Sequence, residues 1–204
     1  MKENHGQYTI CHVELAKIAL REHRYADALA LLQATDQYPY NLGEGKLINA
    51  EENDIWYYKG LAYRGLGDEE NAKLWLHKAT QGSAEPQQAF FYNDAQPDKI
   101  FYQGLAWRAL GEESKARGRF NKLIKHGEET LIRPLPHRLL CRIVARPGHL
   151  EDNLDKRNAI HCNYVMGLGY LGLEDRVHAI EYLDKARALD INHQGAQIHR
   201  ELCE

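Results

Sequence analysis

Two arginines with aromatic neighbours are the residues of this sequence best suited to bind a charged ligand. Arg64 and Arg108 stand 44 residues apart in two segments of similar sequence, and Tyr57 and Phe101 each precede one of them by two helical turns. A guanidinium group beside an aromatic ring can hold an extended peptide and pair with a carboxylate on it. A binding surface is one interpretation of this pattern. A second interpretation stays open, in which the aromatic residues are core and the arginines pair with acids such as Asp94 or Glu52.

Other chemistry-bearing patterns in the sequence are weak. The eleven histidines form no HExxH or HxH motif, and the adjacent pairs Cys11-His12 and His161-Cys162 would point about 100° apart on a helix, which suits joint metal ligation poorly. The sequence holds no GxSxG, phosphate-binding loop or dinucleotide fingerprint. The acidic run at 68–70 fits the solvated start of a helix. We therefore expect no enzyme, no cofactor and no metal.

Composition places the chain among ordinary globular proteins. It has 204 residues, of which 44% are hydrophobic and 27% charged, enough for one domain or one repeat array. No apolar run approaches the roughly 18 residues of a membrane span, and the N-terminal stretch lacks the apolar core of a secretory signal. Four widely spaced cysteines indicate reduced thiols rather than a disulfide framework. We expect a cytoplasmic protein.

The chain repeats itself at an interval of 44 residues. Shifted by that interval, the segment 54–79 falls on 98–123, and the two share identical residues at eleven positions, among them Gly60 and Gly104. Self-similarity at a fixed interval is the signature of a repeat architecture.

Each copy predicts two helices joined by a tight turn. Apolar residues recur at helical spacing through 55–66, the run GDEE interrupts them, and Ala72 and Leu76 resume the pattern. Gly67 suits the left-handed residue that ends a first helix, and Gly60 suits a close crossing of the paired helices. This order of residues resembles the tetratricopeptide repeat.

Weaker copies at 12–39 and 163–192 flank the pair. We therefore predict an all-α, tetratricopeptide-like superhelix of four helical hairpins with long inter-repeat loops. Repeats 1–3 would occupy residues 7–130, and the fourth repeat with a C-terminal capping helix would occupy 151–204. Stacking of four hairpins would bury a continuous core.

The resemblance to tetratricopeptide repeats also implies a binding face. In such arrays the concave face takes its side chains mainly from the first helix of each hairpin, and a peptide or protein partner binds there. We predict a non-catalytic interaction scaffold. Its partner-binding positions would be Lys17, Tyr57, Leu61, Arg64, Phe101, Leu105, Arg108, Tyr164 and Leu168.

The long loops carry a closer resemblance. Segments 38–47, 91–111 and 151–162 look like parts of large, mainly bacterial proteins in which an all-β region of unknown function, similar to carbohydrate-handling β-sandwiches, precedes a C-terminal tetratricopeptide array. The resemblance covers about residues 7–130 and 151–195. It implies an alternative function: the chain would be a C-terminal fragment of a carbohydrate-acting protein, and the array would dock on and support a β-domain.

Residues 115–149 differ from the rest of the chain in charge. They carry nine Lys or Arg against two acids and three of the six prolines, whereas the whole chain has a net charge of −3. Such a stretch ordinarily indicates nucleic acid or an anionic surface. The family that the loops resemble continues here with a sequence close to IDYFAVSLPDL, and codons chosen for 137–152 can read IDYFAVSLPDLAI in another frame. We hypothesise that 131–150 is an irregular basic linker translated out of frame, and expect no nucleic-acid and no membrane partner.

Overall fold

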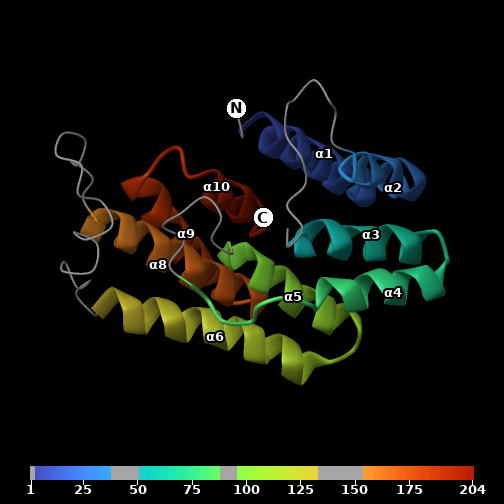
Figure 1. Ribbon diagram of the computed structural model, residues 1–204. Helices are drawn as coiled ribbons and strands as arrows, with labels where there is room; N and C mark the ends of the chain where they lie inside the picture. The colour runs from blue at the N-terminus through green and yellow to red at the C-terminus, as the bar shows by residue number, and fades with distance from the viewer. Residues whose placement is uncertain (1–2, 38–50, 88–95, 133–153) are drawn as a thin grey trace. The chain divides into compact units, whose positions relative to one another are not determined.

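The computed structural model describes residues 3–37, 51–87, 96–132 and 154–204. These residues form only α-helices and their connections (Figure 1), so the predicted all-α class is confirmed for them. No helix in these ranges is long and apolar enough to cross a membrane. The helices are α1 (Glu3–Arg21), α2 (Tyr25–Ala34), α3 (Asn53–Gly65), α4 (Glu69–Ala79), α5 (Pro97–Ala109), α6 (Glu113–Ile132), α8 (Leu154–Gly172), α9 (Arg176–Leu189) and α10 (Gln194–Glu201).

Several predictions concern residues outside these ranges. The loop before α3 up to residue 50, the loop residues 88–95 with Asp94, and the basic segment from residue 133 to 150 all lie outside the described residues. The helix α6 extends to Ile132, which is the second residue of the segment predicted as an irregular linker.

Consecutive helices pack as the hairpins that the sequence predicted. The helix α1 packs on α2, α3 on α4 and α8 on α9, and further contacts join α2 to α3 and α10 to α9. The segments forming each hairpin can be followed side by side in Figure 1. Fully buried alanine and leucine side chains occupy the interfaces, among them Ala72 and Leu76 of α4 and Ala179 and Leu183 of α9.

Glycine allows the two helices of a hairpin to cross closely, as predicted for Gly60. A Cβ atom added to Gly60 on α3 would lie 2.6 Å from Cγ of Leu76 on α4, a distance at which one of the helices must shift. The fourth hairpin repeats this contact, because a Cβ on Gly167 of α8 would lie 2.7 Å from Cγ of Leu183 on α9. The internal repeat is therefore present in the packing as well as in the sequence.

The same turn joins the helices of four described hairpins. In each, one residue has a positive φ, and the N–H of the next residue donates to the carbonyl five positions earlier at 2.8–3.0 Å. The predicted left-handed residue Gly67 has φ 81°, and Gly111, 44 residues later, has φ 83°. The equivalent residues of the first and fourth hairpins are His23 (φ 58°) and Glu174 (φ 65°). The turn is thus kept where glycine is absent.

The chain divides into two compact units whose boundaries fall inside helices. Unit 1 comprises Met1–Gly82 and Tyr102–Ala116, and unit 2 comprises Ser83–Phe101 and Arg117–Glu204. The last two turns of α5 therefore belong to unit 1 and its first residues to unit 2. Within unit 2, the close approach of α6 and α8 is clear at Gly169, where an added Cβ would lie 2.8 Å from the carbonyl oxygen of Phe120.

Candidate functional site

The nine predicted binding positions divide between the two units. Unit 2 holds Phe101, Tyr164 and Leu168, and unit 1 holds the other six, Lys17, Tyr57, Leu61, Arg64, Leu105 and Arg108.

Four of the nine side chains are buried. Phe101 packs on the rings of Phe120 and His199 at centroid distances of 6.0 and 5.4 Å, and Leu168 has no exposed surface. The hydroxyl of Tyr164 lies 3.2 Å from Nδ1 of His199, inside unit 2. These side chains fill the packing between helices and expose at most 5% of their surface, in line with the alternative interpretation of the aromatic residues as core.

Lys17 is the fourth buried position. Its side chain is only 7% exposed, and its ammonium group donates to both carboxylate oxygens of Glu14 one turn earlier, at 2.9 and 2.7 Å. The charge predicted to face a ligand is thus already neutralised within α1.

Tyr57, Arg64 and Arg108 come together in unit 1. Tyr57 is half-buried between helices, and burial raises the pKa of its phenol to about 12, while the positive charges of Arg108 and Arg64 both act to lower it. The phenol therefore lies within electrostatic reach of both guanidinium groups. Arg64 on α3 also donates through Nη2 to the carbonyl of Ala109, the residue that follows Arg108 on α5, at 3.1 Å.

Both arginines pair with acids at the starts of the helices that follow them. Arg108 makes two contacts to the carboxylate of Glu113, at 2.9 and 3.0 Å, and Nε of Arg64 lies 3.7 Å from Glu69. Glu69 and Glu113 are the first residues of α4 and α6, and their side chains are 57% and 50% exposed. Exposed ion pairs of this kind contribute little to stability. A ligand carboxylate can therefore replace them at small cost.

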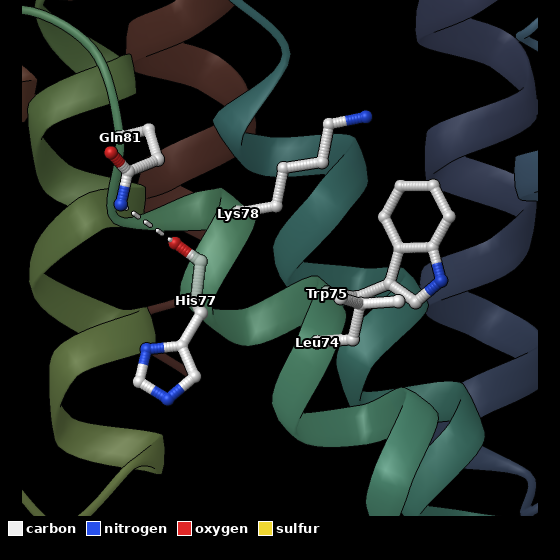
Figure 2. Close-up of a pocket in the computed structure, with 5 residues that line it drawn as sticks. All are labelled: Leu74, Trp75, His77, Lys78 and Gln81. Atoms are coloured by element: carbon white, nitrogen blue, oxygen red, sulfur yellow. Dashed lines mark hydrogen bonds between the residues drawn. The ribbon is translucent and has the colours of Figure 1, made fainter.

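A hollow of about 440 Å³ lies on the outer face of α4, at a place that the sequence did not predict. Figure 2 shows its lining residues, with the indole of Trp75 beside Leu74 and Gln81 donating to the carbonyl of His77 at 3.3 Å. Leu74 is 63% exposed. In the sequence, the helical spacing of apolar residues assigns Leu76 to the core and leaves Leu74 outside the buried face. A leucine outside that face was the signal that could have indicated this hollow.

The cation beside this hollow is held by aromatic rings. Nζ of Lys78 lies 4.6 Å from the ring centroid of Trp56 and 4.7 Å from that of Trp75, both typical of cation–π contacts. The other partner of Trp75 is the ammonium of Lys59, 4.6 Å from the ring. The hollow thus combines an exposed apolar side chain with a positive charge.

Metal binding finds no support among the described residues, where no group of three His, Cys, Asp or Glu side chains could hold an ion. Comparison with known proteins adds no assignment: no protein-family model matches the chain, and no solved structure matches it.

Proposed function

We propose that this protein is a non-catalytic interaction module built on tetratricopeptide-like hairpins, and that it binds a carboxylate-bearing peptide segment of a partner protein in unit 1. The arrangement of Arg64 and Arg108 carries the proposal. They hold equivalent positions in adjacent hairpins, and Tyr57 lies within reach of both charges.

The chemistry of the pair suits a peptide carboxylate. A guanidinium group presents two parallel N–H donors to a carboxylate, and such charge-assisted hydrogen bonds contribute roughly 1.5–3 kcal/mol each. The half-buried side chains of Leu61 and Leu105, each four residues after an aromatic residue, supply apolar surface in the same helices. The recurrence of one turn and one helix crossing in several hairpins supports the tetratricopeptide-like assignment.

The test compares two labelled hexapeptide pools. One pool contains Asp and Glu and ends in a free carboxylate, and the other contains Asn and Gln and ends in an amide. We expect the acidic pool alone to bind the protein, and binding to weaken at least tenfold in the double variant Arg64→Gln/Arg108→Gln.

The matched control removes the same charge elsewhere in unit 1. Arg21 and Lys73 are exposed, and the double variant Arg21→Gln/Lys73→Gln should bind as the unchanged protein does. A third variant, Arg64→Lys/Arg108→Lys, keeps the charge but loses the paired donors. If the control variant loses as much binding as Arg64→Gln/Arg108→Gln, the effect is one of net charge and the proposal is contradicted. Equal binding of the two pools would also contradict it.

The hollow on α4 favours a second candidate, in which the chain is the C-terminal part of a longer, carbohydrate-acting protein and docks on its β-domain. An exposed leucine beside a tryptophan and an ammonium group is suited to a protein surface. Sequencing the DNA upstream of Met1 tests this candidate first. If a β-region is encoded there, that region should bind the chain in trans and should lose binding with Leu74→Asp. A β-region that binds Leu74→Asp as tightly as the unchanged chain would contradict docking at this face.

A further inference from the structure

Unit 2 contains a small polar pocket that the proposed peptide binding does not use. Its volume is about 210 Å³, and three parts of the chain line it: the start of α5, one face of α8, and the connection between α9 and α10. The side chains of α8 on this face follow at helical spacing and include Arg157, His161 and Tyr164. Asp190 and His193 approach from the connection. The pocket is below the usual size of sites for drug-sized ligands, so it suits a small molecule.

Opposite charges line this one pocket. Arg157 supplies a guanidinium group and Asp190 a carboxylate, and the carboxylate is fixed in place because Oδ1 accepts the N–H of Asn192 at 3.0 Å. A small molecule with a carboxylate and an ammonium group offers a complementary charge to each of these two residues, whereas a simple acid or a simple amine is complementary to one of them and repelled by the other.

The two histidines in the pocket are uncharged at neutral pH. Burial, together with the neighbouring His126 and His193, lowers the pKa of His161 to about 4, and burial lowers the pKa of His193 as well. Nδ1 of His193 accepts the N–H of Ala196 at 3.0 Å, so the neutral ring carries its proton on Nε2 as a donor. The ring of His193 therefore adds a hydrogen-bond donor without disturbing the balance of charge.

The shape of the pocket is fixed by packing. The ring of Tyr164 lies against that of His193 with centroids 4.6 Å apart, and its hydroxyl is held by His199. Gly195 allows this arrangement, because a Cβ there would lie 2.6 Å from the hydroxyl oxygen of Tyr164. A pocket with a fixed aromatic wall loses little entropy when it binds a ligand.

We propose that this pocket, lined by Arg157, Asp190, His161 and His193, binds a free α-amino acid. The carboxylate of the ligand pairs with Arg157 and its ammonium group with Asp190. The proposal is independent of the peptide surface in unit 1.

The experiment measures thermal stabilisation of the full chain by each of the twenty common L-amino acids at concentrations up to 10 mM. A ligand that binds the folded state raises the melting temperature in a saturable way. We expect at least one amino acid to do so. Its analogue without the amino group and its analogue without the carboxylate should each bind at least tenfold more weakly. Absence of any saturable shift would overturn the proposal, and so would an analogue that binds as tightly as the amino acid.

Two variants assign the ligand to this pocket. Arg157→Gln and Asp190→Asn should each weaken binding at least tenfold, whereas Arg176→Gln and Asp155→Asn, which remove exposed charges of unit 2, should leave it unchanged. Asp190 also accepts the backbone N–H of Asn192, so Asp190→Asn could disturb the fold. Its result counts only if circular dichroism shows native helicity, and otherwise Arg157→Gln decides the assignment. The variant Arg64→Gln/Arg108→Gln should keep amino-acid binding. Unchanged binding in Arg157→Gln would overturn the assignment.

Discussion

Lys59 has the least exposed charged side chain among the described residues, and its neutralisation depends on Asp36. The ammonium lies 2.7 Å from Oδ2 of Asp36, with 1% of the lysine side chain exposed against 48% of the aspartate side chain. Water can therefore solvate the carboxylate but not the ammonium. Removal of the partner of a buried charge is far more costly than removal of the charge itself.

We expect Asp36→Asn to lower the free energy of unfolding by roughly 3 kcal/mol, because it leaves the ammonium uncompensated. Lys59→Met should be close to neutral, since methionine fills a similar volume and needs no counter-charge. Urea unfolding of both variants measures the difference. The double variant Asp36→Asn/Lys59→Met should recover most of the loss; a double variant as unstable as Asp36→Asn alone would contradict this explanation.

At the scale of single residues, the sequence predicted correctly those positions whose role depends on the backbone alone. Gly67 and Gly60 were predicted correctly because a left-handed turn and a close helix crossing both depend on local pattern. The surroundings of Phe101 and Tyr164 depend on which helices pack against them, so their burial could not be separated from exposure on a concave face. The pairing of Arg64 with Glu69 and of Arg108 with Glu113 was not predicted, because it likewise depends on how the two helices of a hairpin meet.

The turn between paired helices leads to a prediction at the element scale. A non-glycine residue in the left-handed region costs roughly 1 kcal/mol relative to glycine. We expect Glu174→Gly to be more stable than Glu174→Ala by about that amount, and Gly67→Ala to be less stable than the unchanged protein by a similar amount. Thermal unfolding compares the variants.

The alanine variant is the matched control for the turn. It removes the side-chain interactions of Glu174 but keeps a Cβ, so the difference between Ala and Gly isolates the backbone. Equal stability of Glu174→Ala and Glu174→Gly would show that this turn carries no backbone strain.

The crossing glycines give a second prediction for the helices. Gly60→Ala and Gly167→Ala should each destabilise the protein by about 1–3 kcal/mol, because the added methyl group would overlap the leucine of the partner helix. Gly118 on α6 provides the control, since a Cβ there meets nothing within 4 Å. Gly118→Ala should stabilise the protein by up to about 1 kcal/mol through helix propensity. Chemical denaturation measures the free energy of unfolding of the three variants. An equal gain in stability in all three would refute the close crossing.

Three buried or half-buried histidines make acid sensitivity a property of unit 2. The pKa values of His126, His161 and His193 are all lowered, chiefly by burial, and that of His161 falls to about 4. The unfolded chain binds a proton on each of these histidines near pH 6.5, and the folded chain does not. The histidines therefore make their full contribution to the free energy of unfolding above pH 6.5. This contribution is lost as the pH falls from 6.5 toward 4.

We expect the free energy of unfolding to fall over this pH range, with His161 contributing up to roughly 3 kcal/mol. The variant His161→Gln should flatten the dependence while remaining folded at pH 8. All three tryptophans, Trp56, Trp75 and Trp107, lie in unit 1, so their fluorescence reports that unit, while circular dichroism reports both. We expect helicity to fall at a higher pH than the fluorescence changes. An unaltered slope in His161→Gln would refute the role of this residue.

At the scale of the whole molecule, the sequence predicted the helical hairpins but not the sites between distant segments. The hairpins could be predicted because their apolar residues recur at helical spacing along consecutive stretches of the chain. The pocket of unit 2 requires the start of α5, the face of α8 and residues 190–193 to meet, and no pattern within any one of these segments indicates that meeting. The division into units that cross helix boundaries was likewise not visible in the repeat interval.

This division has a consequence for the order in which the protein can form during synthesis. Residues 83–101 leave the ribosome before the part of α5 that completes unit 1, whereas the rest of unit 2 runs from residue 117 to 204. At typical elongation rates the last residue of unit 2 follows Phe101 by on the order of 5 to 20 s. During that interval the apolar residues of the segment 83–101, Ile100 and Phe101 among them, are exposed on a nascent chain. A chaperone that recognises short apolar segments would find them there.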